Sequence, residues 1–130
     1  YLRGAYSLDD LQGRLIVLLT NRKGKITGFP TFGLVLCAHQ DLDGEKLVEL
    51  IEPPEKALLG DRIFIDSERS DPLPSPLSTA KLQRDRVWAK ICDAKALVTN
   101  DAGVAIYNGE ALKTNAGVCR AKTLQHVSVH

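Results

Sequence analysis

The chain has 130 residues, of which 44% are hydrophobic and 5% aromatic, and its formal net charge is +1 at pH 7. This indicates about one domain with an aliphatic core, and the total charge argues neither for nor against nucleic acid. There is no run of 18 apolar residues, so no membrane span is indicated. Because the first residue is Tyr1 and not methionine, we expect the chain to be a piece of a longer polypeptide.

The three cysteines, Cys37, Cys92 and Cys119, are widely spaced. No CxxC pair occurs, and the histidines stand at no spacing that is typical of a zinc site. The pattern predicts reduced cysteines that pack as small hydrophobic residues in a reducing, cytosolic setting. We therefore expect no metal and no cofactor.

Charge is distributed unevenly along the sequence. Residues 11–40 carry four basic residues and no acid, residues 41–71 carry ten acids against four basic residues, and residues 81–95 carry five basic residues against two acids. This segregation favours a fold in which one face meets a polyanion, although solvated charge without a function could look the same.

The first third of the chain predicts a short helix and a buried strand. Ser7 and Asp10 have the spacing of a capping box, and Gly13 is placed to end the helix. Residues 14–20 are apolar on both faces, which predicts a central or covered strand. Residues 21–31 then form a polar loop whose Gly-Phe-Pro sequence predicts a turn or kink.

Further strands follow, separated by turns. Residues 32–39 form a second apolar run, and Asp43-Gly44 predicts a tight hairpin turn into a return strand over residues 46–51. Residues 62–66 alternate well enough for another strand. Residues 67–78 contain three prolines among serines and acids, which is typical of a linker or surface excursion.

The last third begins with the only convincing longer helix, over residues 79–92. Its Trp88 is either a packing anchor or a platform on which a base stacks. Residues 104–107 predict a strand, Asn108-Gly109 a type I′ hairpin turn, and residues 117–124 a last strand.

Motifs for catalysis are absent from the sequence. There is no GxSxG, HExxH, P-loop or GxGxxG, and no serine or cysteine stands near a histidine with supporting residues. An enzyme would need residues that are remote in the sequence to assemble in space, so we expect a non-catalytic protein.

Two blocks of sequence resemble a known family. The order RLIVLL, N-x-K-x-K-I-x-G, GLVLCA and ELIEPPEKALLGDRI, followed by RVWAKI, TND and GVCRAKTL, is similar to the C-terminal tRNA-binding domain of the endothelial monocyte-activating polypeptide II family. That domain occurs in auxiliary subunits of multi-aminoacyl-tRNA-synthetase complexes and as an appendix of tyrosyl- and methionyl-tRNA synthetases. The resemblance covers about residues 11–66 and 84–124.

The resemblance implies a mainly β fold with short helices. Residues 1–66 would form the second half of an oligonucleotide-binding (OB-fold) barrel, residues 67–78 a linker, and residues 79–130 a β-rich extension with one helix that packs on the barrel. The first strands of the barrel would be missing from this chain and supplied by upstream sequence or another chain. The edge of the strand over 14–20 is therefore predicted to be paired.

The function implied is non-catalytic, largely sequence-independent binding of tRNA, which delivers or retains tRNA at a cytoplasmic aminoacyl-tRNA synthetase or synthetase complex. The partners would be tRNA and synthetases or other subunits of the complex, with no membrane. The alternative is a protein-protein scaffold module with weakened RNA binding. The expected RNA-binding residues are Asn21, Arg22, Lys23, Lys25, Thr27, Thr31, Phe32, Arg84, Arg86, Lys90, Arg120 and Lys122.

Several of these residues have a second interpretation. Thr27 stands where the family commonly has a basic residue, and Arg22 is the candidate to restore that charge. Phe32 is either part of the core or a stacking surface for a base. The three cations of the second block, Lys90, Arg120 and Lys122, either continue a basic surface or lie on a solvated face.

Overall fold

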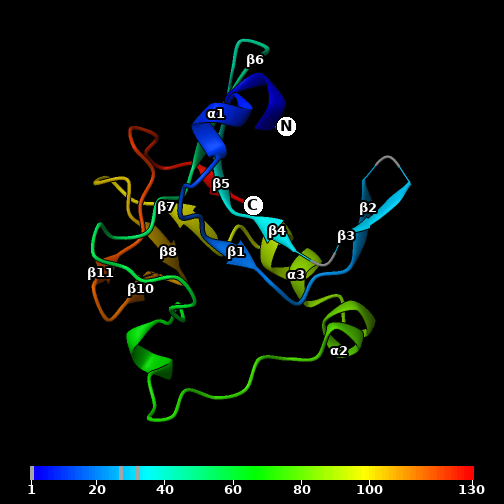
Figure 1. Ribbon diagram of the computed structural model, residues 1–130, viewed down its shortest axis with the longest axis vertical. Coiled ribbons are helices and arrows are strands. Elements are labelled where there is room, and N and C mark those ends of the chain that lie inside the picture. Colours follow the sequence, from blue (N-terminus) through cyan, green and yellow to red (C-terminus); the bar gives the residue numbers. More distant parts are fainter. Residues whose placement is uncertain (1, 27, 32) are drawn as a thin grey trace.

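The computed structural model describes residues 2–26, 28–31 and 33–130 (Figure 1). The helices are η1 (Leu2–Gly4), α1 (Leu8–Leu11), η2 (Asp66–Glu68), α2 (Thr79–Arg84) and α3 (Val87–Asp93). The strands are β1 (Leu18–Leu19), β2 (Gly24–Ile26), β3 (Phe29–Thr31), β4 (Leu34–Val35), β5 (Cys37–Leu42), β6 (Glu45–Leu50), β7 (Leu97–Thr99), β8 (Ala105–Tyr107), β9 (Glu110–Ala111), β10 (Lys113–Thr114), β11 (Gly117–Val118) and β12 (Ser128–Val129). In the described ranges, no helix has the length and apolar character needed to cross a membrane.

A six-stranded sheet organises the fold, in the order β6-β5-β12-β7-β8-β9 with every neighbouring pair antiparallel. The two tight turns predicted from sequence are confirmed. Asp43 and Gly44 have φ of 51° and 82°, and Asn108 and Gly109 have φ of 50° and 86°, the left-handed pairs that a type I′ turn needs. The expectation of a mainly β chain with short helices is confirmed, whereas the OB-fold barrel and the missing first strands stay predictions.

The core draws on both halves of the chain. Val17, Leu36 and Ile51 pack in one cluster with Leu97 and Cys119, among others. Because β12 lies between β5 and β7, the sheet is also continuous from the first half to the second. The segment predicted as an extension therefore shares a sheet and a core with the segment predicted as a barrel.

The cysteines match the expectation of packed, reduced thiols. Cys37 and Cys119 have no exposed surface, and the Cys37 thiol donates to the carbonyl of Val35. Cys92 and Cys119 are free thiols. Burial raises the pKa of the Cys119 thiol to about 11, so this group is protonated and unreactive at neutral pH.

The capping box is confirmed, but the strand predicted after it is much shorter. The Ser7 hydroxyl accepts from the Asp10 amide, and the Asp10 carboxylate accepts from the Ser7 amide. Of residues 14–20, only β1 is a strand, and it pairs with β4. Leu15 and Leu18 are 39% and 46% exposed, so the prediction of a covered strand was wrong. An apolar run predicts burial, but the described residues place no further strand beside this one.

The predicted long helix is two helices. The break is at Arg86, whose φ of 51° lies in the left-handed region and cannot continue an α-helix. Ser78 caps α2, accepting from the Lys81 amide at 3.1 Å. The expectation of one helix in the second half was therefore wrong, and the cause is a local backbone conformation that helix propensity does not reveal.

The last strand was also misplaced. Only β11 and two isolated bridges of Arg120, to Glu52 and Val104, fall within residues 117–124. Cys119 and Ala121 are buried. The strand that completes the sheet is β12, held by His130 N–H to Cys37 O at 2.9 Å. Two residues are too few to give an alternation that sequence can show.

Candidate nucleic-acid interface

The predicted loop over residues 21–31 carries a small hairpin that projects from the molecule (Figure 1). Strands β2 and β3 pair in register, with Gly24 opposite Thr31 and Lys25 opposite Pro30. The chain reverses at Gly28, whose φ of 84° suits glycine. A regular ladder here differs from the expected irregular loop, and it holds the backbone of Lys25 in an extended conformation.

Asn21 ties this hairpin to the helical segment rather than reaching outward. Its Nδ2 donates to the carbonyl of Leu77, at 2.9 Å, just before α2. Its Oδ1 is buried and has no hydrogen-bond partner among the described residues. Asn21, expected to contact RNA, therefore acts first as a positioning residue that brings the hairpin and α2 to the same side of the molecule.

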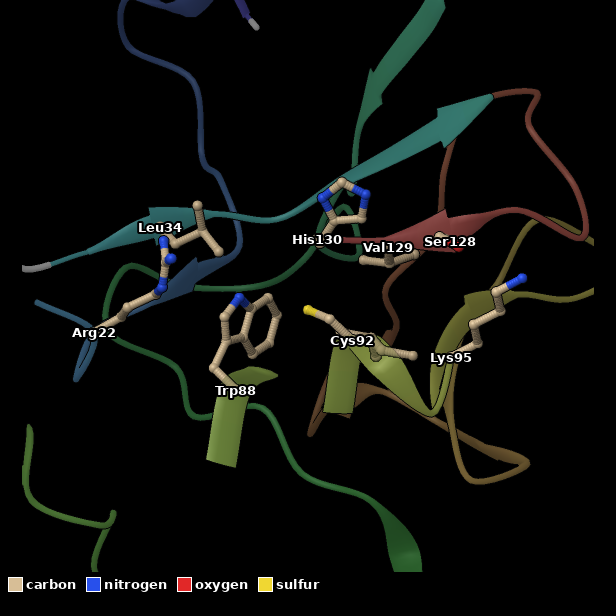
Figure 2. A pocket seen from close by; sticks show the side chains of 9 residues that line it. Arg22, Leu34, Trp88, Cys92, Lys95, Ser128, Val129 and His130 are labelled. Atoms are coloured by element: carbon tan, nitrogen blue, oxygen red, sulfur yellow. The ribbon is translucent and has the colours of Figure 1, made fainter. Parts of the chain in front are cut away.

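Arg22 extends from this anchored loop into a pocket against α3 (Figure 2). The cavity has a volume of about 360 Å³. It is lined by Arg22, Leu34, Trp88, Cys92, Lys95, Leu97, Ser128, Val129 and His130. Figure 2 shows Arg22 at one end and Lys95 at the other, with Trp88 and Cys92 between them. We call this cavity the cationic pocket, because its lining includes two cations and no acid.

The pKa of the Cys92 thiol reflects both its burial in the cationic pocket and the charge of Arg22 there. Burial raises this pKa, the charge of Arg22 opposes that rise, and the neighbouring Asp93 adds to it. The guanidinium of Arg22 is thus close enough to α3 to act on a side chain inside the pocket.

The histidine of the cationic pocket is neutral at pH 7. The rings of His130 and His39 stack with centroids 3.9 Å apart and planes at 4°. Desolvation lowers the pKa of His130, and the neighbouring His39 lowers it further. A neutral imidazole has one donor and one acceptor nitrogen, so it can offer either to a polar ligand.

Two cations beside α3 occupy backbone positions that favour glycine. Arg86 precedes α3 with φ of 51°, and Lys95 follows it with φ of 50°. A residue other than glycine in this region costs on the order of 1 kcal/mol or more. Sequence analysis counted Lys95 in a basic segment but did not name it as a site residue, because its place in the cationic pocket depends on the end of α3.

The hairpin and the α2–α3 segment together form one basic face. Residues 21–31 carry three cations and no acid, and residues 79–95 carry five cations and two acids. Figure 1 shows β2, β3 and α2 on one side of the molecule, with α3 between them and the central sheet. Lys23, Arg86 and Lys90 are exposed there, whereas Arg84 pairs with the neighbouring Asp85 at 3.4 Å. We call this surface, the described residues of 21–31 together with residues 79–95, the basic face.

Three further residues of the hairpin, Thr27, Thr31 and Phe32, were also expected to bind RNA. Thr31 is half-buried, and its hydroxyl donates to the carbonyl of Gly33. Thr27 and Phe32 lie outside the described residues, so their expected roles stay predictions.

Arg120 and Lys122 are not brought to the basic face. They follow β11, which Figure 1 shows across the molecule from β2 and β3. The Arg120 guanidinium donates to the carbonyl of Ala102, and its backbone bridges to Glu52. The sequence resemblance grouped these cations with the others, but the path of the chain separates them.

A second cavity, of about 630 Å³, lies beside β1. Its walls are residues 14–21 and 57–63 with parts of the core, and Trp88 lines both this cavity and the cationic pocket. Leu18 and Leu59 are 46% and 90% exposed at its edge. No backbone hydrogen bond joins Leu15 or Ile16 to another described residue. We call this cavity the apolar groove.

Metal binding finds no support among the described residues, which hold no group of three or more His, Cys, Asp or Glu side chains that could bind one metal ion.

No family model matches the chain. Similar proteins are nevertheless found by sequence. The aminoacyl tRNA synthase complex-interacting multifunctional protein 1 of Cricetulus griseus is 35% identical over 124 residues, and that of Mus musculus is 34% identical, each over 94% of this chain.

The chain spans about a third of these two relatives, 32% and 36% of their lengths. The cytoplasmic tyrosine–tRNA ligase of Danio rerio is 33% identical over 90% of this chain, which corresponds to 21% of that enzyme. The crystal structure of the C-terminal domain of Plasmodium vivax p43 superposes with a TM-score of 0.76 at 24% identity, covering 99% of this chain and 73% of that one. The chain is therefore a homologue of aminoacyl tRNA synthase complex-interacting multifunctional protein 1 and of parts of tyrosine– and methionine–tRNA ligases, which confirms the family resemblance seen in its sequence.

Proposed function

We propose that the chain is a non-catalytic module that binds tRNA through its basic face and holds it near an aminoacyl-tRNA synthetase. The observation that carries the proposal is the basic face itself. Seven cations with described side chains, against two acids, come from two segments that the Asn21–Leu77 hydrogen bond joins across 56 positions of the sequence. Arg22, Lys23 and Lys90 take part in no ion pair among the described residues.

Unpaired, exposed cations are what a phosphate backbone requires. Each phosphate that is neutralised releases counterions, and this term depends on salt but hardly on sequence. Contacts to phosphates carry no sequence information, so binding through these cations is expected to discriminate little between tRNAs. By contrast, ten acids belong to residues 41–71, which are not among the segments that form the basic face.

The homologues supply the cellular setting of the proposal. The matched proteins are named as interacting with a synthetase complex or are tRNA ligases, of which this chain spans a minor part. Because the matched segment is shared by tyrosine– and methionine–tRNA ligases, its contribution does not depend on which amino acid or which tRNA the enzyme uses. We infer that the shared contribution is retention of tRNA, with synthetases or subunits of their complex as partners in the cytoplasm.

The test is fluorescence anisotropy of labelled tRNA over a series of salt concentrations. We expect log K to fall with log salt with a slope of about −3 or steeper, which corresponds to four or more phosphate contacts. Two tRNAs of unrelated sequence should bind within about threefold of one another, because the contacts are to phosphates. Absence of binding at low salt, or a flat salt dependence, would refute the proposal.

The apolar groove favours a second candidate function, that of a protein-binding scaffold. Free backbone groups at Leu15 and Ile16 beside exposed leucines suit an extended apolar segment, which can add as a strand while its side chains fill the groove. We infer that such a segment, from elsewhere in the same polypeptide or from another chain, covers this edge. This includes the possibility that it completes an OB-fold barrel.

Hydrogen exchange measures whether the groove is covered. In the synthetase-associated assembly, the amides of Leu15 and Ile16 should exchange at least about tenfold more slowly than in this chain alone, because they gain hydrogen-bond partners. Leu18→Asp, which places a charge in the groove, should abolish the protection. Leu42→Asp is the matched control, since Leu42 is 52% exposed at the end of β5 and does not line the groove. Equal exchange rates in the two states would count against the scaffold.

A further inference from the structure

We propose that the cationic pocket holds a single unstacked nucleotide of the bound RNA, with its base against Trp88 and its two flanking phosphates at Arg22 and Lys95. This inference rests on the RNA binding proposed above and adds a defined site to it. A phosphate surface alone needs no cavity, whereas unpaired nucleotides are held by aromatic side chains and cations together.

The arrangement of the pocket fits one nucleotide within a strand. Such a nucleotide carries a phosphate on each side of its sugar, and Arg22 and Lys95 stand at opposite ends of the cavity (Figure 2). A volume of about 360 Å³ is at the small end of the range for ligand sites, as expected for one nucleotide. Trp88 and Leu34 offer the apolar surface that a base requires between the two charges.

Polar groups in the same cavity can meet the edge of a base. Ser128 and His130 both line it, and both belong to the segment that completes the central sheet. Because His130 N–H donates to Cys37 O and Cys37 N–H donates to His130 O, the backbone that carries the imidazole is fixed. A fixed polar group on a strand positions a ligand better than one on a loose loop.

The backbone of Lys95 is the second, independent observation. This residue has left-handed φ of 50° directly after α3, a position at which glycine is the usual choice. Its exposed side chain makes no ion pair among the described residues. Lys95 lines the edge of the cavity, and Figure 2 shows its ammonium group directed outward, open to a phosphate at that edge. A lysine held in an unfavourable conformation at the edge of a cavity is better explained by a ligand than by stability.

Trp88 makes the proposal testable, since it is the only tryptophan of the chain. The probe is adenosine 3′,5′-bisphosphate, which carries one base and a phosphate at each end. At low salt it should quench the fluorescence of Trp88, and adenosine 5′-monophosphate should bind several-fold more weakly because it reaches one cation. Unlabelled tRNA should displace the bisphosphate in competition.

Lys95→Gly is the decisive variant. It should weaken the bisphosphate at least fivefold while keeping or raising the unfolding temperature, because glycine relieves the left-handed backbone. A loss of binding therefore cannot be attributed to unfolding. Asn108→Gly is the matched backbone control, since Asn108 has the same φ of 50° on the β8–β9 turn away from the pocket. It should leave the affinity unchanged.

The outcomes separate this inference from the proposed function. If tRNA binds with a salt slope but the bisphosphate leaves Trp88 unquenched, the pocket assignment falls and RNA binding stands. If neither binds, both fall. Unchanged affinity in Lys95→Gly, failure of tRNA to compete, or equal quenching by an aspartate-rich peptide would each overturn the nucleotide site.

Discussion

Replacing Arg22, Lys23 and Lys90 together with alanine is expected to weaken the binding of tRNA on the order of 10²-fold at about 0.1 M salt. The three side chains come from the hairpin loop and α3 and have no ion-pair partner among the described residues. Each lost phosphate contact removes about 0.7 to 0.9 from the slope of log K against log salt. The triple variant should therefore have a slope shallower by about two to three units.

Lys46→Ala with Lys56→Ala provides the comparison. Both lysines are exposed, and neither lies on the basic face. We expect the slope of this double variant to match that of the unmodified chain, which would show that local charge matters and not net charge. All these substitutions are at exposed positions, so circular dichroism and the unfolding free energy should change little, by about 0.5 kcal/mol or less for each.

An unchanged slope in the triple variant would place the RNA surface elsewhere. Arg120→Ala with Lys122→Ala then becomes the informative variant, because these two cations were expected to bind RNA and lie across the molecule from the hairpin. A large loss of tRNA affinity in that variant would show that RNA binds at Arg120 and Lys122, as the sequence predicted, and not at the basic face.

Glu49→Ala is expected to lower the free energy of unfolding by about 2 to 3 kcal/mol. The carboxylate of Glu49, on β6, accepts from the backbone amides of Thr123 and Leu124 and from the Thr123 hydroxyl, at distances from 2.6 to 3.1 Å. Hydrogen bonds to a charged acceptor are stronger than neutral ones, and these three fasten the segment before β12 to β6. Removing the acceptor leaves two amides without their partner.

Urea unfolding measures this effect as a lower midpoint at constant m-value. Glu49→Gln should show an intermediate loss, because the amide keeps one acceptor oxygen but loses the charge. Glu45→Ala is the control, since Glu45 is exposed at the start of β6 and makes no ion pair among the described residues. A midpoint for Glu49→Ala equal to that of Glu45→Ala would contradict the assigned role.

Local signals in the sequence predicted local structure well. The capping box at Ser7 formed with both hydrogen bonds, and both Asx-Gly pairs formed the expected turns. These features succeed because the interactions that specify them join residues at most a few positions apart. Cys119 and Ala121 are buried and Arg120 and Lys122 exposed, as a strand period predicts, but Thr123, which the same period places with Cys119 and Ala121, is exposed because the strand does not continue to it.

Predictions failed where a distant neighbour or a single backbone angle decided the outcome. Residues 14–20 are apolar enough for a covered strand, yet cover depends on a partner that the described residues do not include. The helix over 79–92 breaks because Arg86 adopts a left-handed conformation, which its residue type does not signal. Strand β12 was missed because two residues carry no pattern, although they join the two halves of the sheet.

The candidate site divides in the same way. The sequence by itself determined the family, the segregation of charge, and the cations of residues 21–31 and 84–90, because composition and motif order require no coordinates. Only the tertiary structure decided which cations meet. Asn21 joins the hairpin to Leu77 just before α2, Trp88 and Lys95 line the same cavity as Arg22, and the chain path after β11 carries Arg120 and Lys122 away. The physical reason is that a binding surface is a matter of distance in space, which chain packing sets and separation in sequence does not.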